Sequence, residues 1–147
     1  MPYGKYLHVG GDEITEIGID DRCKATGKTA FELQMIWLKN VCQFAVDHGR
    51  IPIFWDDMPL KYAGIWELAL SDKSEEEVVK VWNTDKLDEA IGLFPKECVY
   101  MRWKYEDATT PAHRRLLEWY HDKGLKVMGA TAASAGDSPF MPRRNTR

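Results

Sequence analysis

Two neighbouring carboxylates near the start of the chain, Asp12 and Glu13, are the residues best suited to do chemistry. Adjacent side chains of a regular strand point to opposite faces, but Gly10 and Gly11 precede the pair and allow the strand to break and turn both acids toward one pocket. Two close carboxylates in a partly dry site have pKa values that move apart, which leaves one acid and one anion. Such a pair suits cleavage of a glycosidic bond, whose leaving oxygen must be protonated. On spacing alone, a surface turn with two solvated acids is an equal alternative.

Short strands alternate with amphipathic helices along the chain, and these elements must position the carboxylates. Thr29 and Glu32 form a capping-box pattern that predicts a helix start, and Gly49 is a natural helix terminator. Thr110 followed by Pro111 marks another helix start. The expected strands are 5–9, 51–55, 78–82, 98–103 and 126–130, the expected helices are 30–48, 60–70, 85–93 and 111–123, and 132–147 is expected to be loop.

Repeated strand–helix alternation indicates an α/β protein with a parallel sheet, either open and doubly wound or part of a (β/α)8 TIM barrel. Polar and aromatic residues gather at the strand ends, in 11–13, 55–57, 82–83 and 103–105. A barrel builds its active site at that edge, so we favour the barrel. A complete barrel needs about 250 residues. The sequence has 147, so we expect one partial barrel domain over 1–147, with the N-terminal barrel strands absent.

Composition argues against several other classes. The net charge of −3 lacks the basic field of a nucleic-acid-binding protein. No apolar run approaches the roughly 20 residues of a membrane span, and the N-terminus has no signal-peptide pattern. The sequence has an odd number of cysteines, which favours reduced thiols and a cytoplasmic location. They are Cys23, Cys42 and Cys98. Asp56 and Asp57 have no histidine or further acid spaced to complete a metal site, so no metal is expected.

The segment His8-Val9-Gly10-Gly11-Asp12-Glu13 resembles the H-x-G-G-D-E signature of glycoside hydrolase family 20, the β-N-acetylhexosaminidases. Further segments of the chain resemble other motifs of the family and follow one another in the same order. Residues 51–58 resemble the segment of the family's fifth strand, closest to the hexosaminidase D branch. Val81-Trp82 resembles the sixth-strand tryptophan, and 105–107 resembles the Y-x-D element after the seventh strand. The resemblance implies that the chain spans about strands four to eight of the family's barrel.

The resemblance also implies a reaction: retaining, substrate-assisted hydrolysis of terminal N-acetylhexosamine residues from β-glycosides, an exception to the scheme with two protein carboxylates. The 2-acetamido oxygen of the substrate would attack the anomeric carbon and form an oxazolinium ion. Glu13 would protonate the leaving oxygen and later deprotonate water. Asp12 would stay ionised and accept the acetamide N–H. Tyr105 would donate its hydroxyl to the acetamide oxygen.

Further residues would surround the sugar. Asp107 would accept a hydrogen bond from a sugar hydroxyl, and Trp55 and Trp82 would wall the acetamido methyl group. For His8 we favour a structural hydrogen bond to the loop. No cofactor is expected, and the substrate would be an N-acetylglucosaminide or N-acetylgalactosaminide. The absent half-barrel or a second copy of the chain are candidate protein partners. The residues expected around the substrate are His8, Trp55, Asp57, Trp82, Trp103, Tyr105 and Asp107.

Two departures from the family pattern bear on activity. The third pocket tryptophan that the family carries near its eighth strand has no counterpart in 129–136. The sugar-binding arginine of the family's first strand also has no counterpart, because that half of the barrel lies outside the sequence. We therefore expect the isolated chain to be inactive or nearly so and its complete parent to hydrolyse the substrate.

Two alternatives come from other classes. The diguanylate cyclase signature Gly-Gly-Asp-Glu-Phe resembles residues 10–14, but Ile14 replaces the phenylalanine, and the motif stands too early in the chain. A non-catalytic sugar-binding protein or an inactive barrel fragment would keep the fold without turnover. The presence of both acids, Asp12 and Glu13, argues against this second alternative.

Overall fold

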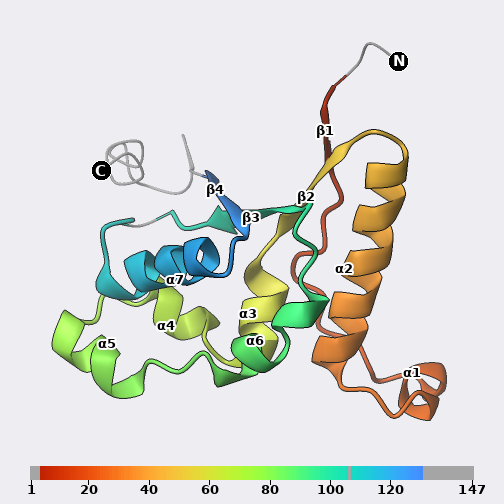
Figure 1. Cartoon of the computed structure of the whole chain (residues 1–147). Helices are drawn as coiled ribbons and strands as arrows, with labels where there is room; N and C mark the ends of the chain where they lie inside the picture. Colours follow the sequence, from red (N-terminus) through yellow and green to blue (C-terminus); the bar gives the residue numbers. More distant parts are fainter. Residues whose placement is uncertain (1–3, 106, 131–147) are drawn as a thin grey trace.

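The computed structural model describes residues 4–105 and 107–130, which contain a parallel four-stranded sheet (Figure 1). The strand order is β1-β2-β3-β4, so strands that are neighbours in the chain are also neighbours in the sheet. A barrel has this order, whereas a doubly wound sheet reverses direction at a switch point. The sheet is therefore compatible with part of an α/β barrel. The strands are β1 (Tyr6–His8), β2 (Ile51–Trp55), β3 (Val99–Trp103) and β4 (Lys126–Ala130).

Helices connect the strands and pack along one side of the sheet (Figure 1). The predicted capping box of Thr29 and Glu32 is formed, and the helix that it opens ends just before Gly49, which has φ +70°. In the described ranges, none of the helices has the length and apolarity of a membrane span. The helices are α1 (Asp21–Ala25), α2 (Ala30–Asp47), α3 (Asp57–Ala63), α4 (Trp66–Leu70), α5 (Glu75–Val81), α6 (Asp85–Glu89), the short 3-10 helix η1 (Ile91–Leu93) and α7 (Pro111–Asp122).

The prediction of a strand at 78–82 is wrong, because residues 78–81 belong to helix α5 and Trp82 is its C-cap. Ser74 accepts from the Glu77 backbone N–H while the Glu77 carboxylate accepts from the Ser74 N–H, so a capping box starts the helix. The acidic first turn also favours a helix N-terminus. Val78 is buried, whereas Val79 and Val81 are exposed. The described part of the chain consequently has four strands where the sequence predicted five.

The predicted helix at 60–70 is divided into α3 and α4. Gly64 has φ +81° and ends α3 with a left-handed residue, which breaks the run of helical hydrogen bonds. Helix α3 begins at Asp57, earlier than predicted and only two residues after the end of β2. The carboxyl end of β2 therefore passes almost directly into a helix that lies beside the strand ends.

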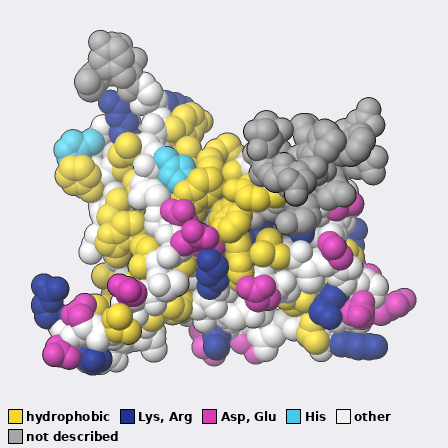
Figure 2. All heavy atoms as spheres, turned by 180° about the vertical axis from the view of Figure 1, so that it is seen from behind, with side chains coloured by type: hydrophobic (Ala, Val, Ile, Leu, Met, Phe, Trp, Pro, Cys, Tyr) yellow, Lys and Arg dark blue, Asp and Glu magenta, His cyan; other side chains and the backbone are white. Residues whose placement is uncertain are grey.

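The hydrophobic core lies between the helices and one face of the sheet. Phe54 of β2 and Tyr100 of β3 are fully buried there, against residues such as Leu38 of α2 and Leu116 of α7. The other face of the sheet is much less covered. Tyr6 is 57% exposed and Met128 is 41% exposed. The two line a shallow hollow of about 480 Å³, and Figure 2 shows hydrophobic side chains gathered on this side of the molecule.

Candidate active site

Both predicted catalytic acids and three predicted sugar-contacting aromatic residues line one open hollow of about 290 Å³. Each comes from the segment at the carboxyl end of β1, β2 or β3, as the strand-end pattern predicts. The rings of Trp103 and Tyr105 lie 5.4 Å apart between centroids and form one continuous aromatic wall. The hollow thus combines ionisable groups with apolar ring faces, which is the mixture that a sugar requires. Its lining residues are Asp12, Glu13, Trp55, Trp103 and Tyr105.

The double glycine forms the turn that brings Asp12 and Glu13 to this hollow. Gly10 has φ +72° and Gly11 has φ +95°, a region that side chains disfavour. A Cβ atom on Gly11 would also lie 2.3 Å from Cε2 of Phe54, so no side chain fits there. The Gly10 carbonyl accepts from the Trp55 N–H at 3.2 Å and fixes the turn to β2.

His8 supports this turn. Its Nδ1 accepts a hydrogen bond from the Gly10 N–H at 3.0 Å, which confirms the predicted structural bond to the loop. The imidazole ring lies 4.7 Å from the Trp55 ring. Burial lowers the pKa of His8, and the nearby charge of Asp12 acts in the opposite direction. A neutral His8 that accepts at Nδ1 carries its proton on Nε2.

The remaining predicted site residues do not line the hollow. Trp82 directly follows α5, and its side chain packs against the hydrophobic core. Asp107 accepts from both the N–H and the hydroxyl of Thr109, at 2.8 and 2.7 Å, in a tight local turn. Asp57 is fully buried beneath the turn and accepts from the Glu13 N–H at 3.1 Å.

Beneath the strand ends lies a buried polar network that the sequence did not predict. Arg102 of β3 is fully buried, and its Nη1 donates to Asp56 Oδ1 at 3.5 Å while its Nε donates to His113 Nδ1 at 3.4 Å. Tyr120 of α7 donates to the other Asp56 oxygen at 3.2 Å. Burial raises the pKa of Asp56 to about 6, although the Arg102 charge opposes this shift. The network joins the start of α3, strand β3 and helix α7 under the candidate site.

The pH dependence of stability should report on this network. Burial, with the charges of Arg102 and Lys104, lowers the pKa of His113 from 6.5 to about 4. Between those pH values the unfolded chain binds more protons than the folded one, so the free energy of unfolding falls as the pH decreases through this window. We expect the wild type to lose on the order of 2–3 kcal/mol relative to His113→Gln between pH 7 and pH 4.

Urea unfolding of both proteins at a series of pH values measures this difference. Asp56 changes the free energy of unfolding in the opposite direction. Its raised pKa makes the folded state bind more protons than the unfolded state between about pH 4 and 6. Asp56 is present in both proteins, so its contribution cancels in the difference. A difference that does not vary with pH would contradict the burial of a neutral His113.

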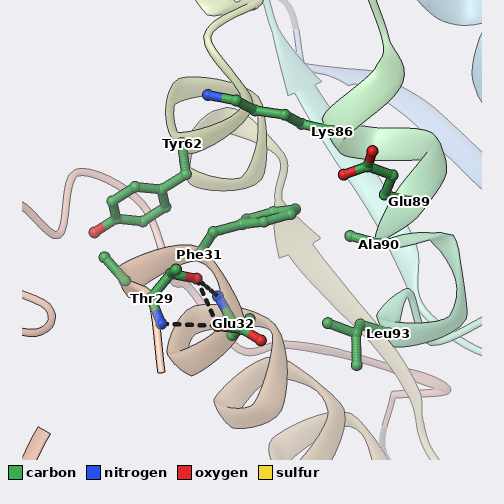
Figure 3. A pocket seen from close by; sticks show the side chains of 9 residues that line it. Thr29, Phe31, Glu32, Tyr62, Lys86, Glu89, Ala90 and Leu93 are labelled. Carbon is green, nitrogen blue, oxygen red and sulfur yellow. Dashed lines mark hydrogen bonds between the residues drawn. The ribbon is translucent and has the colours of Figure 1, made fainter. Parts of the chain in front are cut away.

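A larger cavity of about 500 Å³ lies elsewhere, between α2, α3 and α6. Figure 3 shows the rings of Phe31 and Tyr62 with Lys86 and Glu89 around it. Its remaining acid, Glu32, is engaged in the capping box at the start of α2. None of the predicted site residues lines this cavity, and it holds no pair of adjacent carboxylates. The smaller hollow at the strand ends is therefore the candidate active site.

Comparison with known families places most of the chain in one family. The family described as glycosyl hydrolase family 20, catalytic domain, matches residues 1–114, which include all five residues that line the hollow. The chain belongs to glycosyl hydrolase family 20. It is thus a glycoside hydrolase by family, with a carbohydrate as its substrate, and the diguanylate cyclase alternative is not favoured. Comparisons with curated proteins and with solved structures gave no match.

Proposed function

We propose that this chain carries the reaction centre of a retaining β-N-acetylhexosaminidase, closest to the hexosaminidase D branch of the family. The observation that carries the proposal is the hollow itself, in which Asp12 and Glu13 meet three aromatic side chains. We also propose that residues 1–147 are one part of a larger (β/α)8 catalytic barrel. The weakly covered sheet face around Tyr6 and Met128 supports this, since further protein would bury it. Activity assays should therefore use the full-length protein that carries this sequence.

The proposed reaction uses the substrate's own acetamido group as the nucleophile. Its carbonyl oxygen attacks the anomeric carbon while the bond to the leaving oxygen breaks and Glu13 gives its proton to that oxygen. The Asp12 carboxylate accepts the acetamide N–H and stabilises the positive charge of the cyclic oxazolinium ion. Glu13, now ionised, takes a proton from the water that opens the ring. Two inversions at one carbon give net retention.

The aromatic wall of Trp103 and Tyr105, together with the ring of Trp55, would orient the acetamido group for this attack. Trp55 and Trp103 offer ring faces against which an apolar methyl group and the C–H face of the sugar can pack. Tyr105 lies in the same wall, and its hydroxyl would donate to the acetamide oxygen. Trp82 has no part in this wall, because it does not line the hollow.

The test compares two chromogenic substrates that differ only at C2. We expect 4-nitrophenyl N-acetyl-β-glucosaminide to be hydrolysed at least about 100-fold faster than 4-nitrophenyl β-glucoside, because only the first carries an internal nucleophile held close to the reacting carbon. Release of 4-nitrophenolate measures both rates. Equal rates would contradict substrate assistance, and no hydrolysis of either compound would contradict the proposed activity.

A further inference from the structure

Asp57 is a buried acid whose position the proposed reaction does not explain, and unlike Asp56 it contacts a residue of the hollow. It is the first residue of α3 and has 0% exposure, so it does not face the hollow. A buried carboxylate is costly unless a positive charge and hydrogen-bond donors compensate it. The partners of Asp57 should therefore indicate its role.

Both partners of Asp57 meet at one oxygen. Oδ2 accepts the Glu13 N–H at 3.1 Å and the Lys61 ammonium at 2.9 Å. Lys61 stands one helical turn further along α3 and supplies the counter-charge. Oδ1, also buried, has no hydrogen-bond partner in the described part of the chain. The carboxylate is thus held by one backbone amide and one cation.

The backbone of Glu13 is in a conformation that needs outside support. Its φ is +51°, the one positive value among non-glycine residues of the described ranges. A left-handed residue with a side chain persists only where its surroundings hold it in place. Helix α3 provides two such contacts, since Asp57 accepts from the Glu13 N–H and the Tyr62 hydroxyl donates to the carbonyl of Ile14 at 3.3 Å.

We propose that Asp57 is a positioning residue for Glu13, in place of the sugar contact that the family resemblance implies. With Lys61 as its counter-ion, it fixes the left-handed backbone of Glu13 and so aims the Glu13 carboxyl group at the leaving oxygen. Asp57 itself touches no substrate. This inference rests on the proposed role of Glu13 as the general acid.

The dependence of the rate on the leaving group tests this role. A dinitrophenyl group departs without a proton, whereas the sugar alcohol released from N,N′-diacetylchitobiose needs one. For Asp57→Ala we expect kcat on chitobiose to fall about 10- to 100-fold, as for a misplaced general acid, and kcat on the dinitrophenyl substrate to fall less than about threefold. KM should stay within about threefold for both, because no sugar contact is lost.

Two further variants sharpen the experiment. Asp57→Asn keeps a side-chain oxygen that can accept the Glu13 N–H, so it should retain most of the activity on chitobiose. Asp72→Ala removes an exposed aspartate away from the hollow and should change nothing. A loss for Asp57→Ala that is equal on both substrates would indicate a merely structural role. A rise in KM with unchanged kcat would indicate a sugar contact, and either result overturns the proposal.

Hydrogen exchange at the Glu13 amide tests the geometry without any substrate. In the wild type and in Asp57→Asn, we expect this amide to exchange at least about tenfold more slowly than an unprotected amide, although it lies in an exposed turn. In Asp57→Ala the protection should disappear, and if that variant does not fold, the other two proteins carry the test. Unprotected exchange in the wild type overturns the proposal. A protected amide in a protein without hydrolytic activity would instead count against the proposed function alone.

Discussion

Replacing Glu13 by glutamine is expected to lower kcat for hydrolysis of an N-acetyl-β-glucosaminide by about 10²–10⁴-fold. Glutamine has nearly the same shape as glutamate but cannot give a proton to the leaving oxygen. Glu13 lines the hollow beside Asp12 and the aromatic wall, so the substrate should still bind. Initial rates at saturating substrate measure the loss, and KM should change much less than kcat.

Glu16→Gln is the matched control for this variant. Glu16 is an exposed glutamate that stands three residues further along the same segment and does not line the hollow. The control should retain the wild-type rate. If Glu13→Gln also retained that rate, Glu13 would have no part in the chemistry, and the proposed mechanism would be wrong.

Gly11→Ala, which adds one carbon atom, should lower the free energy of unfolding more than Gly10→Ala does. The new Cβ would lie 2.3 Å from Phe54 Cε2 and 3.1 Å from Trp37 Cζ3, and the φ of +95° is strained for alanine. Overpacking and backbone strain together should lower the free energy of unfolding by roughly 2–4 kcal/mol. Urea unfolding followed by tryptophan fluorescence measures this quantity.

Gly10→Ala separates the two causes. Gly10 also has a positive φ, +72°, but a Cβ there would meet no atom within 4 Å. This variant should therefore show the backbone strain alone, about 1 kcal/mol. Equal losses for the two variants would show that Phe54 does not pack against Gly11 as the structure has it.

Much of the fold could be predicted because local signals mark the ends of its elements. The capping box at Thr29 and Glu32 gave the start of α2, and Pro111 and Gly124 bracket α7. Strands β2 and β4 have the predicted bounds. In each case residues close in sequence determine the boundary, so no knowledge of tertiary contacts is needed.

The segment at 78–82 was wrongly predicted because its valines favour a strand in isolation. The stronger signal was four residues earlier, where Ser74 and Glu77 have the capping-box spacing. The same pattern predicted α2 correctly, so applying it here would have identified α5. The break between α3 and α4 had a signal too, since Gly64 is a natural helix end.

For the site, the strand-end rule brought together the residues of the hollow, and it included Asp57 without indicating that this residue is buried beneath them. Arg102 and Tyr100 are two residues apart along β3, so both point into the helix-covered face. The sequence shows which residues of a strand share a face, but it does not show which of the two faces is buried. The hydrogen bond between Asp57 and the Glu13 amide joins residues 44 positions apart, and no local sequence pattern predicts it. Long-range polar contacts of this kind emerge only from the packed fold.

The central claim is that Asp12, Glu13 and the aromatic wall form one sugar-binding hollow, and a binding experiment tests it most directly. Isotope-labelled Glu13→Gln protein would be titrated with N-acetylglucosamine while the indole N–H signals of its tryptophans are followed by NMR. We predict that the signals of Trp55 and Trp103 shift together and saturate, while those of Trp37 and Trp82 stay in place. Saturable shifts at Trp37 or Trp82, with Trp55 and Trp103 unmoved, would contradict the account.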